Sequence, residues 1–302
     1  MNLKRRDLFK LAGAGTALLM GEKAAANQRN LAGVVDDALG VLVDTSVCIG
    51  CRKCEWACNQ AHKLSSRESK TFEDKSVCLT RRRPTALAYT VVNAVANTAQ
   101  PDKPYYMKIQ CLHCHRPACA SACLVGALRK TESGPVTYDA GKCMGCRYCM
   151  VACPFQIPAY EYSNPLTPRV MKCTFCTDRL AQGNRPACVD ICPNEALMFG
   201  RRRDLLDIAY TRLRQFPDRY VDHIYGETEI GGTSWLYLSA VDFSKTELPV
   251  LTSQAIPEMT ETIQHGIFKH FVPPLLLYGL LGLIMISRRD PKQQKGETPD
   301  VA

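Results

Sequence analysis

The chain has 302 residues, enough for one large domain or two modest domains with real hydrophobic cores. Its 17 cysteines are more than an ordinary protein carries, but they are too dilute for a small scaffold held together by disulfides. The formal net charge of +9 would suit a nucleic-acid-binding protein, yet the arginine runs 81–83 and 201–203 are short and lack the interleaved aromatic residues of a stacking platform. We therefore expect no nucleic-acid partner.

Residues 1–26 have the pattern of a twin-arginine signal peptide. Arg5 and Arg6 stand in a basic region, an apolar stretch over 11–20 follows, and residues 24–26 are alanines that offer a cleavage site. The apolar stretch is too short and too rich in alanine and glycine to be a membrane span. This pattern predicts export, which places the protein on the periplasmic side of the inner membrane.

Sixteen of the cysteines fall into four closely spaced groups. These groups, called runs one to four, are Cys48, Cys51, Cys54 and Cys58; Cys111, Cys114, Cys119 and Cys123; Cys143, Cys146, Cys149 and Cys153; and Cys173, Cys176, Cys188 and Cys192. In run three, three cysteines can hold one cluster, and a fourth that precedes Pro154 can serve a neighbouring cluster. The spacing predicts [4Fe–4S] clusters, with zinc as the alternative, although zinc loops take cysteines in pairs. Cys78 lies outside the runs, in a polar stretch, and we interpret it as a bystander.

The signal pattern and the cysteines support one another. Free cysteines that are exported unfolded into an oxidising compartment form disulfides. The twin-arginine route, by contrast, resembles one that carries proteins already folded around their cofactors. An exported protein whose cysteines hold iron is therefore consistent with this signal.

The four runs form a duplicated unit. The strand-like segments Val41–Asp44 and Val136–Asp139 each end three residues before a run, and runs one and three both continue with Cys, an apolar residue, Gly, Cys and Arg. Runs two and four share an Arg-Pro-Ala-Cys segment, and an Ala-Leu pair follows each of them. We expect Gly50 and Gly145 to let the loop backbone approach a cluster without a Cβ in the way.

Basic and imidazole side chains lie close to the cysteines. We expect Arg52, Lys142 and Arg147 to favour the reduced, more negative form of a cluster and so to raise its potential. His113 and His115 lie inside run two. Because that run already has four cysteines, we expect these two histidines to pack or to form hydrogen bonds rather than to act as ligands.

The segments outside the runs give weaker signals. Residues 63–104 are mostly polar and basic, with an apolar stretch near Ala86–Val95, and are interpreted as an insertion. Residues 201–262 are interpreted as a C-terminal cap. Within the cap, apolar spacing predicts a helix over Asp204–Leu213, and a run behind two glycines predicts a strand over Trp235–Leu238.

Residues 263–289 are predicted to be a single membrane anchor. The stretch 271–286 has no charged residue, and a helix that starts at the beginning of the anchor reaches the roughly 20 residues that a span needs. The two arginines that follow place the tail 290–302 in the cytoplasm and the cysteine-rich body on the other side of the membrane. A buried soluble helix is the alternative.

The sequence has no catalytic constellation. It contains no phosphate-binding loop, no nucleophile elbow and no motif of histidines and carboxylates for a metal. We therefore predict no catalytic residue, and expect a protein that carries electrons and is not an enzyme on its own.

Residues 41–200 resemble the four-cluster ferredoxin-like subunits of the DMSO reductase iron–sulfur family. The signal pattern, the C-terminal segment and three short motifs make the chain most similar to the iron–sulfur subunit of hydrogenase-2-type complexes, with the formate dehydrogenase-N β subunit as a relative. The three motifs are Tyr225-Gly226-Glu227, Gly231-Gly232-Thr233 and Ile263-Gln264-His265. The chain departs from the family at Asn59 and Leu124, where a proline often follows the last cysteine of a run.

The resemblance implies an α+β fold of two ferredoxin-like [4Fe–4S] modules. The first module comprises 41–62 and 166–200, and the second comprises 105–165. The resemblance also implies a nested pairing of the runs. In that pairing the clusters are held by Cys48, Cys51, Cys54 and Cys192; by Cys58, Cys173, Cys176 and Cys188; by Cys111, Cys114, Cys119 and Cys153; and by Cys123, Cys143, Cys146 and Cys149. From the residues alone, tandem pairing of run one with two and of run three with four stays open.

The resemblance further implies an electron-transfer subunit with four [4Fe–4S] clusters. Such a subunit relays electrons between a periplasmic catalytic subunit, of hydrogenase or molybdopterin type, and an integral membrane subunit that reacts with quinone. Two other classes are weighed against this one: a cluster-dependent reductase that acts on its own, and a zinc-binding structural module.

Overall fold

The computed structural model describes residues 38–97, 100–164, 169–261 and 272–287. The chain divides into two compact units, one of Ala25–Glu258 and the other of Met1–Ala24 with Met259–Ala302. Both predicted modules, the insertion and nearly all of the cap fall in the first unit. The predicted signal peptide over 1–26 and the predicted tail over 290–302 lie outside the described residues.

A three-stranded sheet is built around β1 (Leu39–Asp44). On one side, β1 pairs antiparallel with β8 (Leu197–Arg201), and on the other it pairs parallel with β9 (Trp235–Leu238). The register aligns Val41 with both Phe199 and Trp235. As a central strand, β1 is buried at five of its six positions, which fits its Leu-Gly-Val-Leu-Val sequence. The strand predicted over Trp235–Leu238 is confirmed.

Three two-stranded hairpins complete the strand structure. They pair β2 (Val91–Val95) with β3 (Tyr105–Ile109), β4 (Leu128–Lys130) with β5 (Val136–Tyr138), and β6 (Ala159–Tyr160) with β7 (Val170–Met171). Their strands enter or leave the cysteine runs: β3 precedes run two, β4 follows it, β5 precedes run three and β7 precedes run four. The hairpins therefore determine where the ends of the runs lie.

Short helices lie within or beside the cysteine runs. They are α2 (Lys53–Ala61), α3 (Ala118–Ser121), α4 (Tyr148–Ala152), α5 (Thr177–Ala181) and α6 (Ala187–Asp190). The residues that precede α2 and α4 are Arg52 and Arg147, which both have left-handed backbone conformations, with φ of 58° and 60°. Each follows a Cys-x-Gly-Cys segment, so the sequence repeat is also a conformational repeat. The single turns η1 (Ser69–Phe72), η2 (Ser76–Leu79), η3 (Glu229–Gly231) and η4 (Phe243–Lys245) lie in the insertion and the cap.

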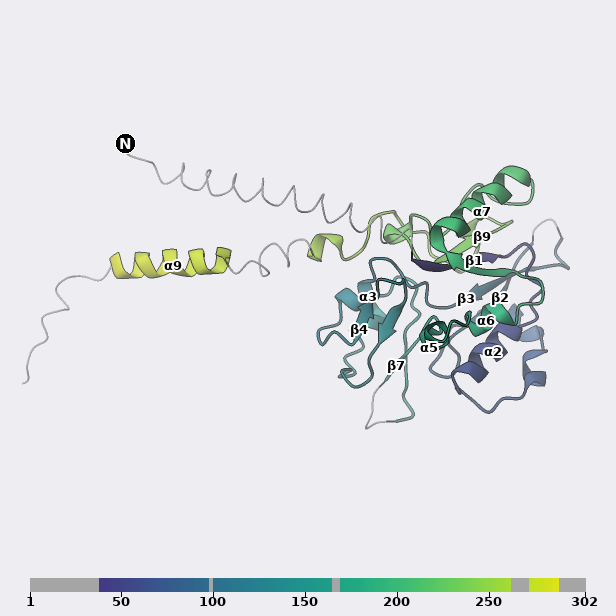
Figure 1. Ribbon diagram of the computed structural model, residues 1–302, viewed down its shortest axis with the longest axis horizontal. Coiled ribbons are helices and arrows are strands. Elements are labelled where there is room, and N and C mark those ends of the chain that lie inside the picture. Colours follow the sequence, from purple (N-terminus) through teal and green to yellow (C-terminus); the bar gives the residue numbers. More distant parts are fainter. Residues whose placement is uncertain (1–37, 98–99, 165–168, 262–271, 288–302) are drawn as a thin grey trace, which may run out of the picture. The chain divides into compact units, whose positions relative to one another are not determined.

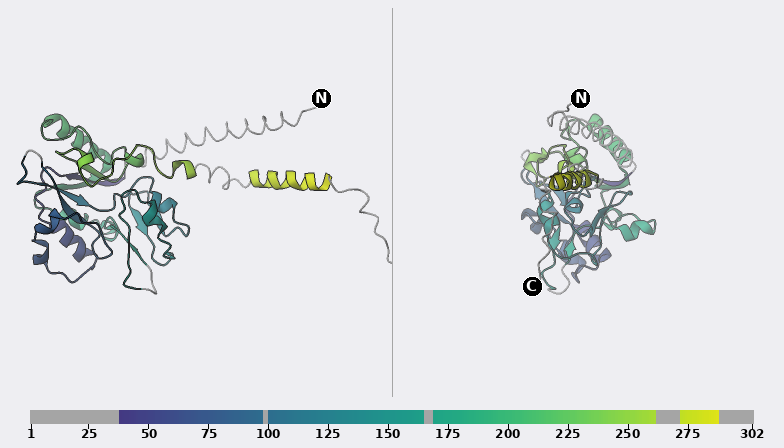
Figure 2. Two further views of the ribbon diagram at one scale, coloured as in Figure 1. Left: turned by 180° about the vertical axis from the view of Figure 1, so that it is seen from behind. Right: turned by 90° about the vertical axis from the view of Figure 1, so that its left-hand side faces the viewer.

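The long helix α7 (Arg202–Gln215) covers one face of the sheet. The helix predicted over Asp204–Leu213 is thus confirmed, with slightly wider bounds. Its buried residues Leu205, Ala209 and Leu213 pack with Leu42 of β1 and Leu236 of β9. Figure 1 shows α7 beside these strands. Figure 2 shows the same sheet and helix from behind, together with the smaller elements that carry the cysteines.

The second unit contains α9 (Val272–Ser287), a helix of 16 residues. Several of its side chains are apolar and exposed, among them Leu276, Leu283 and Met285. Within the described ranges, no helix is both long enough and apolar enough to cross a membrane. The predicted membrane anchor over 263–289 is therefore not supported, and its part over 263–271 and 288–289 lies outside the described residues.

Candidate functional site

All 17 cysteines lie in the described parts of the chain, and all of them are free thiols. Seven are buried, and Cys146 is exposed. Buried free thiols in such number, drawn from four separate loops, are the donors that soft metals and iron–sulfur clusters take. The lining of one cavity and the charge interactions among the thiols group the sixteen cysteines of the runs into four sets.

The first set lines one cavity. Its members are Cys48, Cys51, Cys54 and Cys192. The pairing of β1 with β8 explains why one cysteine comes from run four: Val43 lies opposite Leu197, and the Asp44 N–H donates to the Ala196 carbonyl at 2.8 Å. The end of β1 leads into run one, and the start of β8 leaves run four. The rest of the lining is mostly apolar, with Val43, Ile49, Val92, Ala196 and Leu197, and it also includes the cationic residues Arg52 and Lys108.

The second set surrounds Cys58. Burial raises the pKa of this thiol well above its ordinary value, and the neighbouring thiols of Cys173, Cys188 and Cys176 raise it further. Cys58 lies on α2 and Cys188 on α6, and these two helices pack against each other. The thiols that raise the pKa of Cys58 therefore belong to run four and not to run two.

The third set surrounds Cys114. Burial raises the pKa of this thiol, and the neighbouring thiols that raise it further are Cys111, Cys153 and Cys119. Three members of this set come from run two, and Cys153 is the last cysteine of run three. The pKa of Cys153 itself is raised to about 11, first by burial and also by Cys111.

The fourth set surrounds Cys149, whose pKa is raised to about 11 by burial and then by Cys143, Cys123 and Cys146. The hairpin of β4 and β5 brings Cys123 to run three, because Leu128 lies opposite Tyr138. The Asp139 N–H donates to the Ala127 carbonyl at 2.8 Å, which reproduces the bond between Asp44 and Ala196 in the first set. The repeat seen in the sequence is therefore a repeat of this local structure.

The four sets follow one another in a row. The Cys54 thiol of the first set is a neighbour of Cys188 in the second. In turn, Cys173 of the second set is a neighbour of Cys111 in the third. Finally, Cys119 of the third set is a neighbour of Cys149 in the fourth. Each set thus adjoins the next in the order first, second, third and fourth.

The cysteine sets suit an iron–sulfur cluster better than a single zinc ion. A zinc site holds its sulfur ligands about 2.3 Å from a single ion, and among the described residues no three His, Cys, Asp or Glu side chains are arranged to hold one ion. A cube of four iron atoms, each with its own thiolate, keeps the ligand sulfurs further apart. Cys48, Cys51, Cys54 and Cys192 line one cavity and so offer the four thiolates that such a cube requires.

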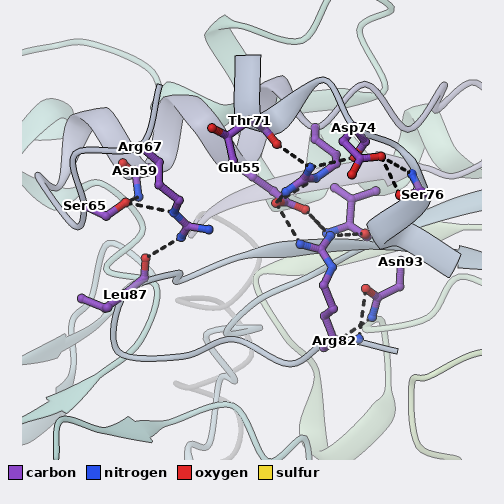
Figure 3. A network of polar contacts seen from close by, with 12 residues as sticks. Glu55, Asn59, Ser65, Arg67, Thr71, Asp74, Ser76, Arg82, Leu87 and Asn93 are labelled. Carbon is purple, nitrogen blue, oxygen red and sulfur yellow. Dashed lines mark hydrogen bonds and ion pairs between the residues drawn. The ribbon is translucent and has the colours of Figure 1, made fainter. Parts of the chain in front are cut away.

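A buried carboxylate anchors the insertion against the helix that carries Cys54 and Cys58. Glu55 of α2 accepts hydrogen bonds from Arg52 at 2.9 Å, from Arg82 at 2.6 Å and from the Val92 N–H at 2.6 Å. Figure 3 shows the Glu55 carboxylate at the centre of this network. Burial alone would raise the pKa of Glu55, but the two guanidinium groups outweigh it and hold this pKa below its usual value.

Arg52 extends this network through another nitrogen of its guanidinium group. Its guanidinium also donates to the Thr71 and Asp74 carbonyl oxygens at 3.2 and 2.8 Å (Figure 3). The sequence predicts that the positive charge of Arg52 acts on a cluster. In the fold this charge is paired with the Glu55 carboxylate. Lys142, the second such residue, pairs with Asp139 at 3.3 Å and is half exposed. Arg147, the third, lies over the ring of Tyr160.

Three lysines are the cations that sequence reasoning missed. Lys108 and Lys172 are each 3% exposed, and Lys130 is half-buried. Burial alone would lower the pKa of Lys108, but the thiols of Cys188, Cys54, Cys173 and Cys58 outweigh it and raise the pKa. The only signal in the sequence was the place of Lys108 in an otherwise apolar strand, where a lysine needs a partner.

The two histidines of run two are buried, as expected for packing residues. His113 is fully buried, and its Nδ1 accepts a hydrogen bond from the Val136 N–H at 2.9 Å. Its ring meets the ring of Phe175 edge-on. Cys78, interpreted as a bystander in a polar stretch, is instead buried at 1% exposure beside Arg82, and is close enough to Cys48 to raise the pKa of that thiol.

Comparison with known proteins adds three relatives and one domain family. Residues 103–202 match the family model of a 4Fe-4S dicluster domain. The chain is 33% identical to the hydrogenase-2 operon protein HybA of Escherichia coli O157:H7, over 99% of both chains. It is 33% identical to the iron-sulfur subunit of the nitrate-inducible formate dehydrogenase of Escherichia coli K12, over 65% of this chain and 66% of that subunit. A Nitratidesulfovibrio vulgaris protein is 51% identical over 85% of this chain and 70% of its own length.

Proposed function

Because this chain belongs to the DMSO reductase iron–sulfur family, together with HybA and the formate dehydrogenase iron-sulfur subunits, we propose that it is an electron-transfer subunit with four [4Fe–4S] clusters and no catalysis of its own. The observation that carries this proposal is the row of four cysteine sets, each of which adjoins the next. When bound, each cluster accepts and releases one electron.

The proposed ligand sets are the nested ones. The first cluster would be held by the set that lines the cavity, with Cys192 completing Cys48, Cys51 and Cys54. The strand pairings support the same arrangement twice, since Ala196 lies next to Asp44 and Ala127 lies next to Asp139. Tandem pairing of run one with run two would instead require Cys58 to face run two, whereas the neighbouring thiols that raise its pKa belong to run four.

The protein around these sets would keep water out of most of the row and leave the fourth set accessible. Val43, Val92 and Leu197 line the first set, and the buried Phe175 packs near the second and third. At the far end, Cys146 of the fourth set is exposed. Apolar surfaces exclude water and strengthen electrostatic interactions within the site, so the first three sets are insulated while the fourth set is available to a partner.

Exposed apolar side chains surround the fourth set. They are Leu124, Val125, Met144, Tyr148 and Val151, and the exposed fraction reaches 81% at Leu124 and at Val151. All of them lie within two residues of a cysteine of that set or of the adjoining Cys153. Contiguous exposed apolar residues mark protein interfaces, and we propose that this face docks a partner subunit.

The proposed partners are a catalytic subunit of hydrogenase or molybdopterin type and an integral membrane subunit that reacts with quinone. The names of the relatives support the first partner, since HybA belongs to a hydrogenase-2 operon and the other subunits to formate dehydrogenases. The membrane partner and the periplasmic location rest on the sequence patterns at 1–26 and 263–289. Electrons would pass between these partners through the four sets in turn.

Metal analysis of the anaerobically purified chain tests the core of this proposal. Four clusters with four iron and four sulfide each give about 16 iron and 16 sulfide per chain. A value near 12 iron would contradict the four-cluster assignment. Zinc in place of iron, without visible absorbance, would support the zinc-binding alternative instead.

A further inference from the structure

Lys108 is a buried cation between two of the cysteine sets. It lies on β3, is 3% exposed, and lines the same cavity as the first set. Its cysteine neighbours are Cys54 of the first set and Cys188, Cys173 and Cys58 of the second. The side chain therefore stands where those two sets meet, and not beside the fourth set.

The position of the Lys108 ammonium is set by a closed ring of hydrogen bonds. Its Nζ donates to Gln110 Oε1 at 3.0 Å, Gln110 Nε2 donates to the Tyr237 hydroxyl at 2.7 Å, and that hydroxyl donates to the Lys108 carbonyl at 2.9 Å. Because the Gln110 amide nitrogen is used on Tyr237, its oxygen is the atom that faces the lysine. The Nζ also lies 4.5 Å from the centre of the Trp235 ring, a contact that favours a cation.

Lys108 differs in its partners from three other cations near the cysteine sets. Arg52 and Arg82 share the carboxylate of Glu55. Lys172 donates to the Val136 and Cys173 carbonyl oxygens at 2.6 and 3.1 Å. Among the described residues, the hydrogen bond to Gln110 is the one that Lys108 makes through its ammonium, and no carboxylate lies within ion-pair distance of it.

A buried ammonium with one protein acceptor needs a compensating anion. Leaving such a charge uncompensated in a protein interior is costly. Four thiolates outweigh the positive charge of a [4Fe–4S] core, so each loaded set is an anion that becomes more negative when it takes up an electron. The cavity that Lys108 lines is the place where the first of these anions would sit.

We propose that Lys108 is the shared counter-charge of the first and second clusters, and that it raises the reduction potential of both above what their cysteines alone would give. This rests on the proposed function, because it requires clusters in those two sets. The physical reason is that a fixed positive charge in a dry site stabilises the more negative, reduced form. No proton and no bond is exchanged: one electron arrives at a cluster, and the lysine stays in place.

The test is anaerobic redox titration of the full chain followed by electron paramagnetic resonance, with iron content measured on each sample. We compare Lys108→Met and Lys108→Gln, which remove the charge, with Lys108→Arg, which keeps it. The matched control is Lys53→Met, which removes the same charge from an exposed side chain next to the ligand Cys54. Water screens a charge at that position.

We expect Lys108→Met to lower the potentials of two of the four clusters, with at least a tenfold shift toward the oxidised form at a fixed potential, or about 59 mV for a one-electron couple. The other two clusters, the Arg variant and the Lys53 control should stay close to wild type. Unchanged potentials in fully loaded Met and Gln variants, or an equal shift of all four clusters, would overturn the inference.

The iron content of each variant distinguishes the outcomes in which clusters are missing. If the Met and Gln variants fail to load clusters while the Arg variant loads all of them, the charge is required and the inference holds. If the Arg variant also fails, Lys108 acts through its shape and the inference is wrong. A wild-type chain with fewer than four clusters would contradict the proposed function and would be recognised before any variant is compared.

Discussion

The first and second cysteine sets differ from the third and fourth in their surroundings, although the local chain is nearly the same. Around the first set, run one follows a central strand of a three-stranded sheet covered by α7. Around the fourth set, run three follows a two-stranded hairpin, and Cys146 is exposed. Both halves keep the same bond from an Asp N–H to an Ala carbonyl.

The repeated cysteine runs therefore determine the ligand loops, whereas the elements packed around them determine the environment of each set. The potential of an iron–sulfur cluster depends on burial, on hydrogen bonds to its sulfurs and on nearby charge. The half with the first two sets has the Glu55 network and Lys108, whereas the fourth set has exposed apolar neighbours such as Val151. One duplicated motif can therefore supply clusters with unlike potentials.

The largest effect is expected from the loss of a ligand in each half. Cys188→Ala should remove one cluster of the buried half, so iron should fall from about 16 to about 12 per chain. It should also lower the thermal midpoint strongly, because α6 and α2 pack around that set. Cys146→Ala should cost the same amount of iron at the exposed end with a smaller change in the midpoint. Equal drops of the thermal midpoint in Cys188→Ala and Cys146→Ala would show that the two halves do not differ in this way.

Glu55→Gln should produce the next largest effect. Removing one partner of a buried pair leaves charge uncompensated and costs about 3–5 kcal/mol. Here both Arg52 and Arg82 would lose their carboxylate. Asp139→Asn, at a pair in the other half that is half exposed, is the matched control and should leave stability nearly unchanged. The measurement is the midpoint of anaerobic urea unfolding, and a Glu55→Gln midpoint equal to that of the control would remove the structural role assigned to the network.

Alanine at the two equivalent glycines should give a moderate and unequal effect. Gly50 and Gly145 have φ of +64° and +73°, and a side chain in this left-handed region costs roughly 1–2 kcal/mol. At Gly50, a Cβ would also come within 2.5 Å of the Tyr106 ring. We therefore expect Gly50→Ala to lower the thermal midpoint more than Gly145→Ala. Equal midpoints for the two variants would show that the Tyr106 ring moves aside freely.

The smallest effect on the isolated chain is expected at the exposed face of the fourth set. Val151→Asp changes a side chain that is 81% exposed, so iron content and stability should stay close to wild type. Binding to a partner subunit should weaken, because a charge replaces an apolar contact. Co-purification of partner subunits with the wild type and with Val151→Asp measures this. Undiminished co-purification would place the docking face elsewhere.

Much of the local structure could be predicted from the sequence, because it depends on residues close together in the chain. The spacing within each run and the strand over Trp235–Leu238 are local features. The helix over Asp204–Leu213 follows from its apolar spacing, and α7 extends it by two residues at each end. The membrane anchor over 263–289, which also rested on a local count of apolar residues, gained no support from the described residues.

The arrangement of the runs was decided by tertiary structure, because it depends on strand pairings far apart in the chain. Nothing in run one indicates that β1 will lie antiparallel to β8, some 150 residues later, and so bring Cys48 to Cys192. The same holds for the charges. The sequence suggested Arg52 as a cation for a cluster, but in the fold it is paired with Glu55. Lys108 faces the cysteines, and in the part of the chain that the structure describes no carboxylate pairs with it. Sequence spacing determines which residues can bind a cluster, and long-range packing determines which of them meet and which charges remain unbalanced.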